Sequence, residues 1–144
     1  MVSIREQLAH YDAGPPPLPD LQLEQSRRDL ARVVSALFER WNLDGASQLQ
    51  LLGLSPESRK LLPRYRAGER ALPAQRDILD RAGYLLGIHK ALRFLFPEDE
   101  ALRFDWVHRR NAALDHATPL DIMLRDGLLG IARVARLLDF QRGR

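Results

Sequence analysis

Apolar residues recur in this chain at steps of three and four, which is the spacing of one face of an α-helix. The first such stripe predicts a helix over about residues 26–41. Its members are Leu30, Val33, Val34, Leu37, Phe38 and Trp41. A longer segment, residues 73–96, is apolar almost all round, as is typical of a helix inside a core. No segment alternates with the two-residue period of a half-buried strand, so an all-α fold is predicted.

Capping and turn residues divide the rest of the N-terminal half into shorter helices. Asp44 is placed to cap a helix over residues 46–52, and the Gly53 that follows tolerates a left-handed turn. Ser55 and Pro56 then begin a third helix, with the serine as N-cap and the proline in the first helical position. These signals predict three helices before the long apolar segment.

The C-terminal end shows the same kind of signals. Thr118 and Pro119 open a helix that should stop near Gly127, and a final helix is predicted over about residues 128–139. The inward residues of this final helix would be Leu128, Ile131, Val134, Ala135 and Leu138. Gly87, inside the long helix, either lets another helix approach closely or marks a bend.

The residues that could carry chemistry form no catalytic or metal-binding pattern. The chain has no cysteine, which excludes disulfides and thiolate metal sites. The acids at 98–100 suit the positive N-terminal end of a helix, and a metal site there would lack further ligands. Gly127 and Gly130 are too sparse for a phosphate loop. His10, His89, His108 and His116 show no zinc spacing and no nucleophile partner. Neither an enzyme nor a bound cofactor or metal is expected. His89 and Trp41 are expected in the core, whereas Trp106 suits either the core or a contact surface.

Charge and proline content set residues 1–26 apart. They carry one arginine against four acidic residues, and residues 14–19 contain four prolines that favour an extended form. A flexible arm is expected, with a ligand for a proline-binding module as the alternative.

Residues 55–70 and 127–144 each carry a net charge of +3, which suits two anionic partners, or one partner and a solvated face. No membrane span or signal peptide is visible, so a cytoplasmic location is expected.

Residues 44–68 have the layout of a helix-turn-helix, in which a short helix and a glycine-containing turn precede a basic helix. The second helix of such a motif lies in the major groove of DNA, where basic side chains contact guanine edges and phosphates. The candidate DNA-binding residues are Ser55, Ser58, Arg59, Lys60, Arg64 and Arg66. Pro63 departs from a clean recognition helix, which should therefore end at Leu62 or kink. A helical hairpin with a solvated basic face remains the alternative.

The last third of the chain has the most specific pattern. Its landmarks, in order, are Trp106, Asn111, Pro119-Leu120, Gly127, Leu137-Leu138 and Arg142-Gly143-Arg144. This order resembles the toxin-binding domain of the Xre/MbcA/ParS antitoxins. Further upstream, residues 51–55, 66–68 and 86–92 are similar to segments of Xre-type antitoxins, so the resemblance covers about residues 30–144.

The resemblance implies an architecture and a function. It implies an N-terminal helix-turn-helix-like bundle at residues 27–96 and a toxin-binding domain with a basic arm at residues 97–144, after the leader at residues 1–26. Members of the family bind a RES-domain toxin that degrades NAD, block its active site and usually repress their own operon by binding operator DNA. A homodimer within a larger toxin–antitoxin complex is also implied. A dimeric helix-turn-helix repressor without a toxin partner is the alternative.

The resemblance also implies which residues contact the toxin. By position these are Trp106, Asn111, Leu120, Met123, Val134, Leu138, Arg142 and Arg144. The two arginines would belong to a C-terminal arm that enters an anionic-ligand site of the toxin, a role that suits the planar fork of a guanidinium. A frayed, solvated end of the helix is the alternative.

Overall fold

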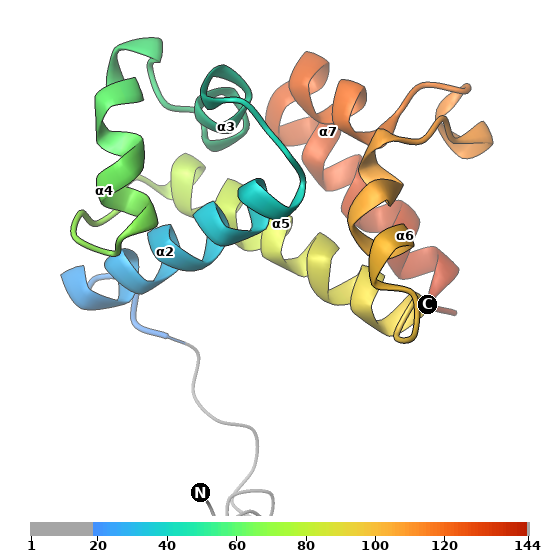
Figure 1. Cartoon of the computed structure of the whole chain (residues 1–144), viewed down its shortest axis with the longest axis horizontal. Coiled ribbons are helices and arrows are strands. Elements are labelled where there is room, and N and C mark those ends of the chain that lie inside the picture. Colours follow the sequence, from blue (N-terminus) through green and yellow to red (C-terminus); the bar gives the residue numbers. More distant parts are fainter. Residues whose placement is uncertain (1–18, 144) are drawn as a thin grey trace, which may run out of the picture.

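The computed structural model describes residues 19–143, and every regular element in that range is helical (Figure 1). In chain order the elements are α2 (Glu24–Arg40), α3 (Gly45–Leu52), the 3₁₀ helix η1 (Pro56–Leu61), α4 (Leu62–Arg66), α5 (Arg76–Leu95), α6 (Glu100–Asp105), the 3₁₀ helices η2 (Trp106–His108) and η3 (Ala112–Leu114), and α7 (Pro119–Gln141). The predicted all-α fold is therefore confirmed. Most of the leader, His10 and Arg144 lie outside the described residues.

The long helix α5 joins the two halves of the molecule. It packs against α2 and α3 on the N-terminal side and, most extensively, against α7 on the C-terminal side (Figure 1). Buried residues of α2, α5 and α7 form one hydrophobic cluster, which includes Phe38, Leu85 and Val134. A further link crosses between the halves, because the Gln50 side-chain nitrogen donates a 2.7 Å hydrogen bond to the Leu124 carbonyl oxygen.

The N-terminal helices follow their sequence signals closely. The carboxylate of Asp44 accepts a hydrogen bond from the Ser47 amide at 2.8 Å and so caps α3, and Gly53 ends that helix with φ 72°. Trp41 is fully buried, as predicted. Val33, counted in the apolar stripe of α2, is instead 42% exposed. The apolar stripe of α2 is therefore slightly wider than the face of this helix that packs in the core.

The predictions for α5 need two corrections. The helix begins at Arg76 and not at residue 73, and it is not buried all round, since Phe94 is 62% and Tyr84 45% exposed. Gly87 does not admit a close neighbour, because a Cβ atom built there would meet nothing within 4 Å. The helix also runs through Gly87 without a break. Both sequence-based reasons for this glycine are wrong.

The segment after Ser55 changes helix type once. It is a 3₁₀ helix from Pro56 to Leu61, capped by the Ser55 hydroxyl, and continues as α4 from Leu62. Pro63 falls in the first turn of α4, where an amide has no helical acceptor and its absence costs little. The predicted disturbance near Leu62 is thus a 3₁₀-to-α transition.

The helix α7 consists of two helical halves that meet in a kink at Gly127, where φ is 63° and ψ is −139°. A non-glycine residue rarely adopts this conformation. A Cβ atom on Gly130 would lie 2.3 Å from the Ile122 carbonyl oxygen, so the two halves of α7 cross in close contact there. The predicted break at Gly127 is confirmed, and the second half ends at Gln141, two residues later than predicted. Gly127 thus allows the kink, and Gly130 allows the close contact between the two halves of α7.

Candidate functional site

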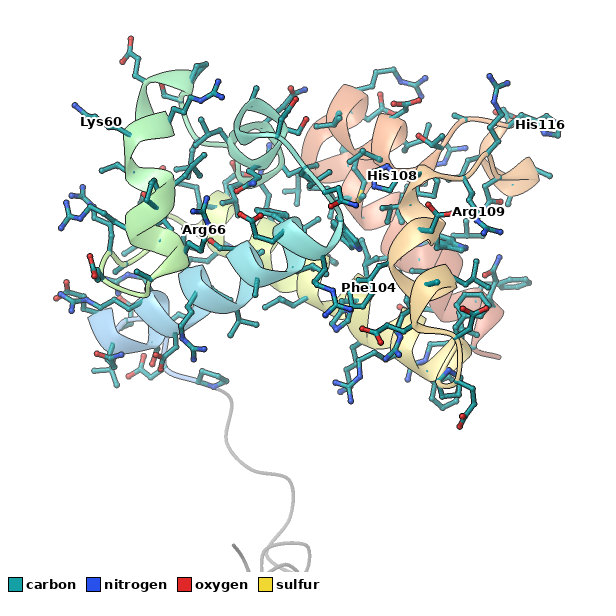
Figure 2. All side chains as sticks on the ribbon, in the orientation of Figure 1. Lys60, Arg66, Phe104, His108, Arg109 and His116 are labelled. Atoms are coloured by element: carbon teal, nitrogen blue, oxygen red, sulfur yellow. The ribbon has the colours of Figure 1, made fainter. Side chains whose placement is uncertain are left out.

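A compact connection between α6 and α7 places the first predicted contact residues. The Asp99 carboxylate caps α6 by accepting from the Leu102 amide at 3.0 Å. Trp106, on η2, is only 8% exposed and belongs to the core. The neighbouring His108 ring nitrogen Nε2 lies 2.6 Å from the Trp41 carbonyl oxygen, which ties η2 to the end of α2 (Figure 2).

Asn111 organises the loop before α7. Its side-chain oxygen accepts from the Ala113 amide at 3.0 Å, and its carbonyl oxygen accepts from the His116 amide at 2.9 Å. The loop turns sharply at Asp115 and His116, both with positive φ. The hydroxyl of Thr118 then accepts from the Asp121 amide at 3.0 Å and starts α7, as predicted. The half-buried Asn111 therefore holds the local backbone structure of this loop.

The predicted contact residues of α7 divide by burial. Met123, Val134 and Leu138 are at most 1% exposed and pack in the core, so they shape the domain without presenting surface. Leu120 is half-buried. The family pattern had placed toxin contact on all four of these side chains. In this structure only Leu120 offers part of its surface to a partner.

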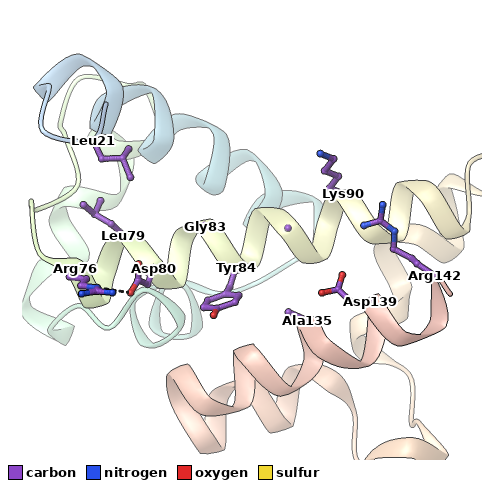
Figure 3. A pocket seen from close by; sticks show the side chains of 11 residues that line it. Leu21, Arg76, Leu79, Asp80, Gly83, Tyr84, Lys90, Ala135, Asp139 and Arg142 are labelled. Atoms are coloured by element: carbon purple, nitrogen blue, oxygen red, sulfur yellow. Dashed lines mark ion pairs between the residues drawn. The ribbon is translucent and has the colours of Figure 1, made fainter. Parts of the chain in front are cut away.

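Arg142 caps the C-terminal end of α7 and lies back on α5. Its guanidinium carbon is 4.7 Å from the centroid of the exposed Phe94 ring, a cation–π contact. The side chain borders a groove of about 670 Å³ between α5 and α7 (Figure 3). Gly83, Tyr84 and Asp139 also line this groove. Arg142 is thus held against Phe94 of α5 and does not project freely. Arg144 lies outside the described residues.

Sequence reasoning missed the outer face of α7. Leu129 and Phe140 are 80% and 74% exposed, and both lie on the second half of the helix. Arg133 and Arg136 lie between them and are also exposed. These four residues, here named the outer α7 stripe, share one face because they are spaced by four, three and four residues. The sequence signal for this surface was that Leu129 and Phe140, both large and apolar, do not belong to the predicted inward face of the helix.

The DNA-binding candidates lie together on η1 and α4. All six are exposed except the half-buried Ser58. Arg66 is engaged in a 3.0 Å ion pair with Glu39, which offsets part of its charge. In a 3₁₀ helix residues three apart eclipse, so Glu57 stands on the same edge as Lys60. The surface is basic, but the Glu57 carboxylate lies beside Lys60, which was expected to contact phosphate.

Local charges and hydrogen bonds perturb two further groups. The pKa of Asp44 is lowered, chiefly by the hydrogen bond from the Ser47 amide and more weakly by the positive charge of Arg59. Burial lowers the pKa of His89, and neighbouring arginines add to the effect. The His89 ring stacks on Phe104 with centroids 5.5 Å apart, as expected for a partly buried histidine of the core. Neither shift occurs in a cluster of candidate catalytic groups.

Residues 19–143 contain neither a candidate metal site nor a candidate membrane span. That range contains no group of three or more histidine, aspartate or glutamate residues arranged to hold a metal ion. Over the same residues, no helix combines the length and apolar character needed to cross a membrane. The surfaces described above, therefore, are the candidates for function.

The fold and these surfaces define an all-helical protein whose C-terminal part ends in a kinked helix with an exposed outer face. Residues 91–144 match the family described as antitoxin Xre/MbcA/ParS C-terminal toxin-binding domain. Residues 91–144 are thus a toxin-binding domain of this antitoxin family. A toxin is accordingly the partner that the domain implies.

A relative supports the similarity over a longer range. The chain is 40% identical over 121 residues to the uncharacterized protein y4oB of Sinorhizobium fredii (strain NBRC 101917 / NGR234). The aligned region covers 80% of this chain and 90% of that protein. The similarity therefore reaches well beyond the C-terminal domain into the N-terminal helices.

Proposed function

We propose that this chain is the antitoxin of a RES-type toxin, an enzyme that degrades NAD, and that it acts by covering the toxin's active site. The observation that carries the proposal is the family match over residues 91–144, which includes the end of α5, α6 and all of α7. The RES class and NAD degradation follow from the resemblance of the longer sequence. Neutralisation by this route is stoichiometric and needs no chemistry from the antitoxin itself.

The accessible members of the predicted contact set make the contact in this proposal. These are Asn111, Leu120 and Arg142, each half-buried; Arg144 lies outside the described residues and is included from the resemblance alone. Trp106, Met123, Val134 and Leu138 support the contact indirectly, because they pack the core beneath it. Release of Arg142 from Phe94 would give up a cation–π contact, worth about 0.5–1 kcal/mol at an exposed site. That cost is small beside the free energy of a typical protein complex.

Repression of the operon is the second proposed activity, carried by a homodimer that binds operator DNA through η1 and α4. The proposed contacts are Ser55, Ser58, Arg59, Lys60, Arg64 and Arg66. Changing Arg59 and Lys60 to alanine removes up to two phosphate contacts. The dependence of log K on log salt should then flatten by up to about 2. An Arg110→Ala variant, altered at an exposed arginine of the C-terminal half, is the control and should keep the slope.

Co-expression tests the antitoxin proposal. The tagged chain is expressed with the gene beside it in its operon, and both co-purification and cellular NAD are measured. A stable complex that preserves NAD, with depletion when the neighbour is expressed alone, supports the proposal. Operator binding without a co-purifying enzyme and without an effect on NAD would contradict it and favour a dimeric repressor that has no toxin partner.

A further inference from the structure

The outer α7 stripe is a narrow surface with a defined order of groups. At about 100° per residue, Leu129, Arg133, Arg136 and Phe140 lie within about 60° of one another around the helix axis. The eleven steps from Leu129 to Phe140 span about 16 Å at a rise of about 1.5 Å each. Two apolar side chains therefore flank two guanidinium groups along one straight line.

The charges of the stripe are not paired within the described residues, although Arg133 is near enough to Asp126 to contribute to the lowered pKa of that carboxyl. Within residues 19–143, neither Arg133 nor Arg136 takes part in an ion pair. Leu129 and Phe140 are the two most exposed large hydrophobic side chains in the same range. Unpaired charge between exposed apolar groups is typical of the anchors of a protein interface, where aromatic residues and arginine are enriched.

We propose that the outer α7 stripe docks the toxin, and that the toxin presents acidic side chains between two apolar sites about 16 Å apart. The inference rests on the proposed function, since it takes the toxin as the partner. It differs from the family-based contact set, of which none of the four residues is a member. The acidic partner follows from charge complementarity with Arg133 and Arg136.

A second copy of the chain fits the stripe poorly. Two stripes paired about a twofold axis would place Leu129 against Phe140 of the second copy and Arg133 against Arg136 of the second copy. Two cation–cation contacts would then lie at the centre of the interface, where like charges are costly. A membrane surface also fits poorly, because a helix that lies in a lipid interface needs a broad apolar face. Only two apolar residues lie on this one.

The stripe is also separate from the proposed DNA surface. In Figure 1, α4 lies at one end of the molecule and α7 at the other, with α5 between them. In Figure 2, Lys60 and Arg66 belong to the α4 end, whereas His108 and Arg109 belong to the α6 end beside α7. Changes to the stripe should therefore affect toxin binding and leave operator binding intact.

Two pairs of substitutions test the inference on the full-length chain. One pair is Arg133→Glu with Arg136→Glu, and the other is Leu129→Ser with Phe140→Ser. The matched controls are Arg93→Glu with Arg110→Glu and Leu23→Ser with Val33→Ser, all at exposed positions off the stripe. Thermal unfolding first establishes that each variant folds. The Kd for the enzyme encoded beside this chain is then measured at low and high salt.

Each stripe pair should weaken toxin binding at least tenfold, while each control stays within about twofold of the unchanged chain. Charge reversal should also reduce the loss of affinity that the unchanged chain shows at high salt. Toxin binding that neither stripe pair weakens would overturn the inference and leave the antitoxin proposal standing. No binding by the unchanged chain would overturn both. Loss of operator binding or of self-association, with toxin affinity kept, would assign the stripe to DNA or to a second copy and likewise overturn the inference.

Discussion

The close crossing inside α7 makes a sharp prediction for Gly130→Ala. The added methyl group would lie 2.3 Å from the Ile122 carbonyl oxygen and 2.9 Å from the Asp126 Cβ atom. The first of these is a backbone atom, which moves only if the two halves of the helix move apart. Overpacking of this kind typically costs about 1–3 kcal/mol. It outweighs the gain of about 1 kcal/mol that alanine otherwise brings to a helix interior.

Gly87→Ala is the matched control in a helix of the same protein. A Cβ atom there meets nothing within 4 Å, and Gly87 has no unusual dihedral angle. The substitution should therefore stabilise the protein by about 0.5–1 kcal/mol through helix propensity alone. The same chemical change is expected to act with opposite signs at two sites.

Urea unfolding followed by circular dichroism measures both effects. Gly130→Ala should lower the midpoint and Gly87→Ala should raise it, with the slope of free energy against urea unchanged in each case. A shift of about 2–4 °C in Tm per kcal/mol is expected in a matching thermal scan. Equal stabilisation of the two variants would refute the close crossing, because only the crossing distinguishes the two sites.

Three further predictions concern the same domain and its junction with α5. Thr118→Ala removes the hydroxyl that caps α7 and should cost about 1 kcal/mol in urea unfolding, whereas Thr118→Ser should keep most of it. Gly127→Ala places a side chain at φ 63° and should cost about 1–3 kcal/mol, unlike Gly83→Ala, which no neighbour opposes. The pKa of His89 is lower in the folded than in the unfolded protein, so stability present above about pH 6.5 should be lost as the pH falls through the folded value. His89→Gln should remove that part of the pH dependence of unfolding, and an unchanged profile would assign it to other groups.

The helices were predictable because their local signals agree with their tertiary roles. The caps at Asp44 and Thr118 sit immediately before the helices that they begin, and the glycines at 53 and 127 have positive φ where a turn was expected. Such signals act over a few residues and need no knowledge of neighbours. For this reason most helix boundaries predicted from the sequence lie within two or three residues of those in the structure.

The glycines at 87 and 130 show where local reasoning stops. Gly87 looked like a site of close approach and is open, whereas Gly130 looked like part of a weak loop motif and lies against backbone. Their sequence contexts are both those of a glycine within a helix. Only the path of the chain after the kink at Gly127 distinguishes them, and that path depends on the packing of α7 against α5.

The predicted contact set shows a related difficulty on the two faces of α7. The order of Met123, Val134 and Leu138 helps to make the domain recognisable, and all three are buried. A pattern of core residues identifies a fold, because packing constrains these positions more tightly than it constrains the surface. The opposite face, where Leu129 and Phe140 are exposed, is the one on which the proposed docking of the toxin would take place. Under that proposal, the buried residues that mark the family and the exposed stripe that would dock the toxin lie on different sides of the same helix.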